Sequence, residues 1–201
     1  MSLRLAILGY LSTGPGTGYD MSRQFDTGLG WFWSARHSQI YPELRRMTQM
    51  GLITRDPDMA GENLEKFTYR ITEEGRSVLT EWVNSPPVYP PNRDVERLQL
   101  IFADDAPEAL RAHLEAHREH HERHCRRLRE ILDAIESGEH ERINLRLRNR
   151  PEETRNLTLG LRVLAYSGDL ERAQLEVRWA ERALAWLDAR EAAVSPEVKG
   201  G

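Results

Sequence analysis

The sequence predicts a mainly α-helical protein with two parts: an N-terminal winged helix-turn-helix, in which helices combine with a two-stranded β wing, and a C-terminal long-helix dimerisation domain. Two observations support this fold class. Residues 31–50 combine apolar positions at helical spacing with a polar opposite side. Residues 84–93 are rich in proline, and beyond them the pattern is entirely helical.

Two short helices are predicted before the 31–50 segment. Residues 3–11 form a strongly apolar stretch that is followed by Gly14-Pro15-Gly16, a run that supplies a turn and cannot continue a helix. Thr17 is a suitable N-cap for a second helix. That helix is expected to end in the glycine-containing run at 26–30.

The helix at 31–50 is predicted to have one buried and one exposed face. Ile40, Leu44 and Met47 recur at helical spacing and should face a core. If Ser38 caps the helix, Pro42 falls near its first turn, where a missing N–H costs little. The other face carries side chains that bond phosphates and base edges, namely His37, Ser38, Gln39, Tyr41, Arg45, Arg46 and Gln49. This arrangement is typical of a helix that enters the DNA major groove.

A β-hairpin is predicted after Gly51. Residues 52–55 form one short strand candidate, and residues 64–71 alternate aromatic and polar side chains, as a half-buried strand does. A polar loop at 56–63 separates them. Thr72-Glu73-Glu74 then opens a fourth helix. The winged helix is therefore predicted to span residues 1–83, with a stiff Pro-rich linker at 84–93.

Long helices are predicted for residues 94–191, with a tail at 192–201. A short helix covers Val95 to Phe102, a long one runs from about Pro107 to Glu136, and the last from Pro151 to about Arg190. The apolar positions expected to pack in the last helix are Leu157, Leu161, Leu164, Leu175, Trp179, Leu184 and Leu187. Helices this long cannot bury their apolar faces within so small a unit, so a partner subunit is expected to cover them.

Composition narrows the classes of partner. The formal net charge of -4 argues against indiscriminate polyanion binding. DNA binding would depend on local clusters, with Arg36, Arg45 and Arg46 on the third helix and Lys66 and Arg55 on the hairpin. The single cysteine excludes an intrachain disulfide. Because neither a signal peptide nor a long apolar run occurs, a cytoplasmic protein with no membrane partner is expected.

A second group of chemically versatile residues lies on the predicted 107–136 helix. His117, His121, and His124 or Cys125 interrupt its apolar stripe on one face, at spacings that can hold Zn, Ni or Cu. Three interpretations are open: a solvated or register-setting polar layer, a proton-sensitive or ligand-lined cavity, and a metal site. The first is favoured because such histidine pairs are often incidental, so neither metal nor cofactor is expected.

The tryptophans suggest a second candidate site. Large flat side chains at Trp31, Trp33, Trp82, Trp179 and Trp186 could line a pocket for a small aromatic effector. Packing in a core or an interface is the favoured interpretation, and none of them is assigned to a ligand.

Several motifs in the same order make nearly the whole chain resemble the PadR family of bacterial transcription regulators. The motifs are Gly14-Pro15 followed by Gly18-Tyr19, the Ser38–Met47 helix, Gly51-Leu52-Ile53, and Tyr69-Arg70-Ile71-Thr72-Glu73-Glu74-Gly75-Arg76. The segments Phe32–Tyr41, Leu98–Phe102 and Trp179 to Leu187 resemble the subgroup with a virulence-activator-type C-terminal domain. The resemblance implies a homodimer whose winged helices read a two-fold symmetric operator in double-stranded DNA. Family members are mostly repressors, the subgroup includes an activator, and some members respond to phenolic acids or drugs.

We therefore expect a DNA-binding transcriptional regulator that represses. The residues expected to contact DNA are Arg36, His37, Ser38, Gln39, Tyr41, Arg45, Arg46 and Lys66. Tyr41 has an alternative role, in which its ring packs under the helix and only its hydroxyl is exposed. The alternative functions are a winged-helix protein-interaction module and a transcriptional activator. An enzyme is not expected, because the sequence lacks a Gly-rich phosphate loop, a nucleophile elbow and a metalloprotease motif.

Overall fold

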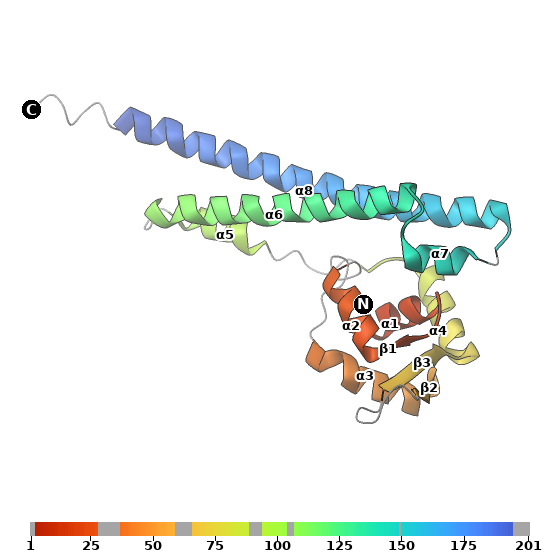
Figure 1. Cartoon of the computed structure of the whole chain (residues 1–201). Helices are drawn as coiled ribbons and strands as arrows, with labels where there is room; N and C mark the ends of the chain where they lie inside the picture. The colour runs from red at the N-terminus through yellow and green to blue at the C-terminus, as the bar shows by residue number, and fades with distance from the viewer. Residues whose placement is uncertain are drawn as a thin grey trace, which may run out of the picture. The chain divides into compact units, whose positions relative to one another are not determined.

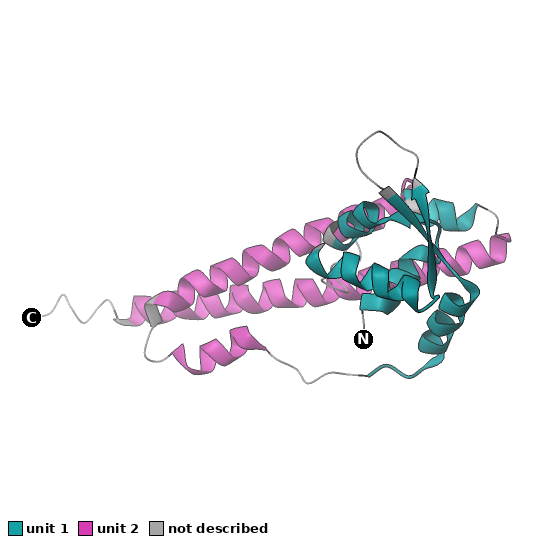
Figure 2. Ribbon diagram, turned by 90° about the horizontal axis from the view of Figure 1, so that it is seen from below, with its two compact units in different colours: residues 1–90, 141–149 teal, residues 91–140, 150–201 magenta. Residues whose placement is uncertain are grey.

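The computed structural model describes residues 3–27, 37–58, 66–88, 94–103, 107–148 and 150–194. The chain divides into two compact units, residues 1–90 with 141–149 and residues 91–140 with 150–201 (Figure 2). The first unit combines helices with a small sheet, and the second is built from helices (Figure 1). The predicted fold class is confirmed. The domain boundaries predicted near residues 83, 93 and 191 stay predictions.

Three helices form the core of the first unit: α1 (Leu3–Leu11), α2 (Gly18–Thr27) and α3 (His37–Gln49). Each contributes side chains that are almost completely buried, and these include Ile7, Leu8, Met21, Phe25, Ile40, Leu44 and Met47. Thr17 caps α2 as predicted: its Oγ1 accepts a hydrogen bond from the Asp20 N–H at 3.1 Å. The Asp20 carboxylate in turn accepts from the Thr17 N–H at 3.1 Å, which completes a reciprocal cap.

The described part of α3 begins at His37, so the predicted capping role of Ser38 is wrong. Ser38 lies inside the helix, and Pro42 is the sixth residue of α3 rather than the fourth. Pro42 has no N–H to donate to the Ser38 carbonyl, a small loss because Ser38 is exposed to water. The predicted helical residues 31–36 lie outside the described residues.

Gly51 ends α3 in the left-handed conformation, with φ of 70°. The Leu52 N–H donates to the Met47 carbonyl at 3.0 Å, and the Gly51 N–H donates to the Thr48 carbonyl at 3.1 Å. These two bonds make a Schellman motif, which satisfies carbonyls that the helix leaves without partners. The motif turns the chain from α3 directly into the hairpin.

The sheet has the order β1-β3-β2, all antiparallel. Strands β2 (Ile53–Asp58) and β3 (Lys66–Ile71) form the predicted hairpin, and β1 (Gly16–Thr17) adds a third strand where a turn was predicted. Residues 56–58 belong to β2, although a loop was predicted there. An edge strand tolerates Pro57, and Asp56 is held by Arg70 of β3 at 3.2 Å.

Two further helices complete the first unit. Helix α4 (Glu73–Asn84) begins at the predicted position, where Thr72 Oγ1 accepts from the Gly75 N–H at 3.1 Å. Helix α7 (Glu141–Leu147) was not predicted. Its Arg146 donates to the Ser12 hydroxyl at 3.0 Å, and its Leu145 side chain lies over Gly14. A segment distant in sequence therefore belongs to the first unit.

The second unit consists of α5 (Val95–Ile101), α6 (Pro107–Glu136) and α8 (Glu152–Val194), close to the predicted bounds. Helices α6 and α8 pack along each other in antiparallel fashion, since Arg111 near the start of α6 bonds Asp188 near the end of α8 at 2.7 Å (Figure 1). A second Schellman motif at Gly138, with φ of 73°, ends α6. Among the described helices, none is both long and apolar enough to cross a membrane.

The face of α8 that packs in this unit differs from the predicted one. Tyr166, Ala173, Ala180 and Leu187 are buried and recur every seven residues, which is coiled-coil spacing. Leu184 and Leu187 are buried as predicted, whereas four predicted positions are 51–70% exposed: Leu157, Leu161, Leu164 and Leu175. At about 100° per residue, these four leucines lie roughly opposite the buried face. Helix α8 is therefore apolar on two sides, and the described residues of one chain cover only one of them.

Gly75 should be intolerant of a larger residue. A Cβ at this position would overlap the Leu52 carbonyl oxygen, which the Thr72 N–H holds at 3.1 Å. We expect Gly75→Ala to lower the free energy of unfolding by roughly 1–3 kcal/mol, measured by urea denaturation. Gly9→Ala is the control, because a Cβ at Gly9 meets nothing within 4 Å. Equal effects of the two substitutions would contradict this packing.

Candidate functional site

The outer face of α3 is a compact polar surface. Burial of Ile40, Leu44 and Met47, each 0% exposed, fixes how the helix is rotated about its axis. The residues on the opposite side are exposed and have hydrogen-bonding or cationic side chains: Ser38, Gln39, Tyr41, Arg45 and Arg46. An Arg4–Glu43 ion pair of 3.1 Å ties α3 to α1 beside this face. We call these five exposed residues the α3 outer face.

Tyr41 takes a position between the two roles that the sequence left open. Its side chain is 45% exposed. Its ring also covers Gly18 at the start of α2, so closely that a Cβ on Gly18 would lie 2.6 Å from the Tyr41 Cε1. The ring is thus held on one side by the neighbouring helix while the other side remains accessible.

The hairpin contributes to the same neighbourhood. Burial raises the pKa of Tyr69 on β3, with smaller opposing effects from the positive charges of Arg55 and Arg45. Arg55 on β2 is paired with Tyr69 in the strand register, and the charge of Arg45 on α3 also acts on the Tyr69 hydroxyl. The Arg55 guanidinium stacks over the Phe67 ring at 4.8 Å and remains exposed. Helix and hairpin together present cations around the α3 outer face.

The structure brings five of the eight predicted DNA-contacting residues together on the α3 outer face. His37 and Lys66 lie at the starts of α3 and β3, but their side chains are outside the description, as is Arg36 entirely. Arg55 was predicted as a cation of the hairpin, although not among these eight residues, and it is exposed on β2. The sequence pointed to Arg55 because this residue lies in a short predicted strand just before a polar loop, and such a strand forms one side of a hairpin. Contact of any of these residues with DNA stays a prediction.

The second unit contains a cavity of about 730 Å³ formed by α5, α6 and α8. Its walls are mostly apolar and include Val95 and Leu98 of α5 and Phe102, which caps α5. These three side chains are 53–70% exposed, so the cavity is open on the α5 side. His113, His117 and His120 of α6 and Trp179 of α8 also line it. Of the five tryptophans considered from the sequence, Trp179 is in this cavity, whereas Trp186 is 59% exposed.

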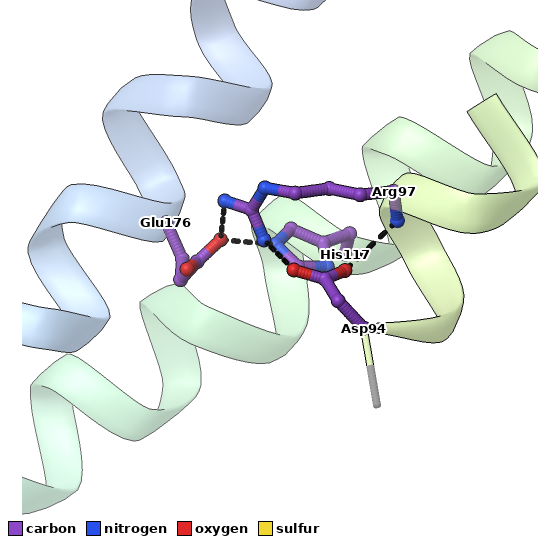
Figure 3. Close-up of polar contacts among 4 residues, drawn as sticks. All are labelled: Asp94, Arg97, His117 and Glu176. Carbon is purple, nitrogen blue, oxygen red and sulfur yellow. Dashed lines mark hydrogen bonds and ion pairs between the residues drawn. The ribbon is translucent and has the colours of Figure 1, made fainter. Parts of the chain in front are cut away.

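A polar network joins α5 to α8 beside this cavity (Figure 3). Arg97 donates to the Asp94 carboxylate at 2.6 Å and to Glu176 Oε2 at 2.9 Å, and its guanidinium lies 4.4 Å from the Trp179 ring centroid. Burial disfavours the Arg97 charge, but the bonds to Glu176 and Asp94 outweigh it and raise the Arg97 pKa. Glu176 Oε2 also lies 3.3 Å from His117 Nε2.

The four sequence candidates for metal binding separate into three environments. His117 and His121 lie with Glu176, and ligand atoms from these three residues are all within 4.8 Å of one another. His124 instead lies 3.1 Å from Asp169. Cys125 is buried, and burial raises its thiol pKa, which disfavours the thiolate that metals bind. The sequence had missed Glu176, because nothing in a helical pattern indicates which acid of α8 opposes the histidines of α6.

Comparisons with known proteins agree with this architecture. Residues 7–81 match the Transcriptional regulator PadR-like family. The chain is 42% identical over 101 residues to the negative transcriptional regulator PadR of Bacillus subtilis strain 168, a match that covers 50% of this chain and 56% of that protein. The sequence match therefore spans only about half the length of this relative.

Solved structures resemble most of the chain. Bacillus subtilis PadR in complex with operator DNA has a TM-score of 0.71 at 30% identity, covering 92% of this chain and 96% of that one. The same protein with p-coumaric acid has a TM-score of 0.57 at 29% identity, covering 92% and 95%. The virulence activator AphA of Vibrio cholerae has a TM-score of 0.65 at 30% identity, covering 94% and 99%.

Acid should destabilise the protein through His121. Burial, helped by neighbouring His117 and His120, lowers the His121 pKa to about 4. In an unfolded chain the imidazole has a pKa of about 6.5, so the unfolded state binds a proton more readily than the folded state does. The contribution of neutral His121 to stability is complete above about pH 6.5 and is lost as the pH falls toward about 4.

The measurement is urea denaturation of wild type and His121→Leu from about pH 7.5 to about pH 5, at equal protein concentration. We expect wild type to lose more stability than the variant over this range, because only wild type carries the poorly basic imidazole. Parallel pH profiles would show that His121 is not held in its neutral form.

Proposed function

The chain belongs to the PadR-like family of transcriptional regulators, and from that premise we propose that it is a DNA-binding repressor that acts as a homodimer. The observation that best supports this is the α3 outer face, which is exposed and polar over a fully buried apolar stripe. Such a helix fits the B-DNA major groove, whose floor presents hydrogen-bond donors and acceptors. We further propose that the protein works in the bacterial cytoplasm and is not an enzyme.

We assign different roles to the residues of this surface. Gln39 is suited to pair bidentately with adenine, and Arg45 and Arg46 to bond guanine edges or phosphates. Ser38, Tyr41 and His37 lie on the same turns of α3 and complete the groove contacts. Arg36, Lys66 and Arg55 supply cations to the phosphates that flank the groove.

The second apolar side of α8 supports the homodimer. Leu157, Leu161 and Leu164 are 57–70% exposed and follow the spacing of one helical face. An exposed apolar stripe of this kind is the usual mark of an interface. The occupant we propose is the same helix of a second copy, because two-fold dimers bring identical patches together.

Dimerisation matters for DNA recognition because one winged helix reaches too few bases. Two copies related by a two-fold axis would place two α3 helices on one side of the duplex, about 34 Å apart. The operator should accordingly have two similar half-sites in inverted orientation. Repression is the proposed sign of regulation because the B. subtilis relative is a negative regulator.

We propose that a small aromatic effector occupies the cavity between α5, α6 and α8. Its volume of about 730 Å³ falls in the range of small-molecule sites, and its lining is mainly apolar with a few imidazoles. The B. subtilis relative has been crystallised with p-coumaric acid, an aromatic acid. The identity of the effector of this chain is a question for ligand screening.

The DNA-binding role predicts that Arg45→Ala with Arg46→Ala abolishes operator binding and leaves the dimer intact. Both side chains are exposed, so their removal should not disturb the core. Binding is measured by fluorescence anisotropy on a duplex selected by the wild-type protein from random DNA. Arg126→Ala with Arg129→Ala is the matched control, since it removes two exposed charges from α6 of the second unit. Retained affinity of the α3 double variant would overturn the assignment of α3.

The same titration should be steeply salt-dependent. For six to ten phosphate contacts, affinity should fall roughly 10³–10⁵-fold between about 50 and 200 mM salt. A winged-helix protein-interaction module would show no such DNA affinity, so this measurement separates the two functions.

The dimer model predicts that Leu161→Arg with Leu164→Arg yields monomers. The four added charges in a dimer would be buried against each other without partners, which an interface cannot accommodate. Light scattering after gel filtration gives the mass of the species. Glu181→Arg, an exposed α8 position off the leucine stripe, is the control and should remain dimeric. An unchanged mass for the leucine variant would place the dimer interface elsewhere.

A further inference from the structure

The region where α6 meets α8 contains a cluster of metal-ligating side chains that DNA reading and dimerisation do not use. His117 and His121 stand one turn apart on α6, and Glu176 faces them from α8. The two imidazole rings have centroids 4.4 Å apart. Two imidazoles and one carboxylate are thus brought together from two helices that pack along each other.

We propose that His117, His121 and Glu176 form a binding site for a divalent transition metal ion of the Zn²⁺ class. Bonds of about 2.0–2.1 Å at tetrahedral angles place two ligand atoms about 3.3 Å apart. His117 Nε2 and Glu176 Oε2 already lie 3.3 Å apart, and all three ligand atoms lie within 4.8 Å of one another. Small side-chain rotations would bring the third ligand into place.

The state of His121 is suited to a ligand. Its Nδ1 is buried and has no hydrogen-bond partner among the described residues. An unpaired buried polar atom is costly, and a metal bond or a hydrogen bond would relieve that cost.

The surroundings of Glu176 resemble the outer shell of a metal site. Arg97 donates to its Oε2 at 2.9 Å and would orient the carboxylate, as hydrogen-bonded partners of ligating carboxylates commonly do. Trp179 and His117 make an edge-to-face contact with ring centroids 5.1 Å apart, which restrains that imidazole. Figure 3 shows how His117 and Arg97 both approach Glu176. Nitrogen and carboxylate donors together favour Zn²⁺, Ni²⁺ or Cu²⁺ over Mg²⁺ or Ca²⁺, which prefer oxygen ligands alone.

Three protein ligands leave at least one coordination position for water or a small ligand. His117 also lines the 730 Å³ cavity. A metal bound here would therefore adjoin the proposed effector space. It would also share Glu176 with Arg97 of α5, one of the helices that form the cavity wall.

The test is calorimetric titration of the untagged full-length protein with Zn²⁺ at pH 7. We expect one ion per chain with sub-micromolar affinity, weakened at least tenfold in both His121→Ala and Glu176→Gln. His113→Ala and His124→Ala, which alter histidines of the same helix outside the cluster, should bind as wild type does. Circular dichroism verifies that each variant is folded.

Two outcomes would overturn the proposal. One is the absence of saturable heat with the wild-type protein. The other is Zn²⁺ binding that survives Glu176→Gln or disappears in His113→Ala, which would place the ion elsewhere. Co²⁺ provides a second reading, because a tetrahedral site gives visible absorption that Glu176→Gln should remove. The titration contains no DNA, so its result is independent of the proposed operator binding.

Discussion

Burial of one apolar stripe on α3 determines which side chains of this helix are exposed, and the proposed function of the first unit depends on them. Ile40, Leu44 and Met47 are completely buried against α1 and α2, and each contributes roughly 1.5–3 kcal/mol by leaving water. Because a helix is rigid, fixing that stripe also fixes the opposite side, where Gln39 and Arg45 are exposed. The position of α3 also sets the position of the hairpin, because the Schellman motif at Gly51 joins the two directly. The proposed reading of DNA therefore depends on a packing interaction that never touches DNA.

The second unit depends on the two-sided character of α8. One side has the seven-residue spacing of Ala173 and Ala180, small residues that let α6 approach closely. The other side exposes Leu157 and Leu161, and a single chain offers nothing among its described residues to cover them. A helix of 43 residues depends on tertiary packing of its apolar faces, and we propose that a second copy covers the exposed one. The histidine cluster lies at the covered side, where α6 supplies partners for acids of α8.

Features that depend on neighbouring residues in the sequence were predicted correctly. Features that depend on contacts between distant segments were missed. The periodicity of Ile40, Leu44 and Met47, the Thr17 cap and the start of α4 after Thr72 depend on local signals, and all were predicted. Strand β1 exists only because β3 pairs with Gly16–Thr17, a contact across some fifty residues that turn chemistry alone does not reveal. The α8 prediction merged two apolar faces into one, since leucines looked more core-like than Ala173 or Tyr166. Glu176 was missed because its role depends on which face of α6 packs against α8, and no local signal in the sequence shows this.

The central claim is that two copies of this chain place their α3 helices in successive major grooves of one operator. Hydroxyl-radical footprinting of the protein on DNA from upstream of its own gene, or on a duplex selected from random sequence, tests it most directly. The account predicts two inverted half-sites protected on one side of the duplex, with centres about 34 Å apart. Protection of a single isolated half-site, or none on any selected duplex, would contradict it.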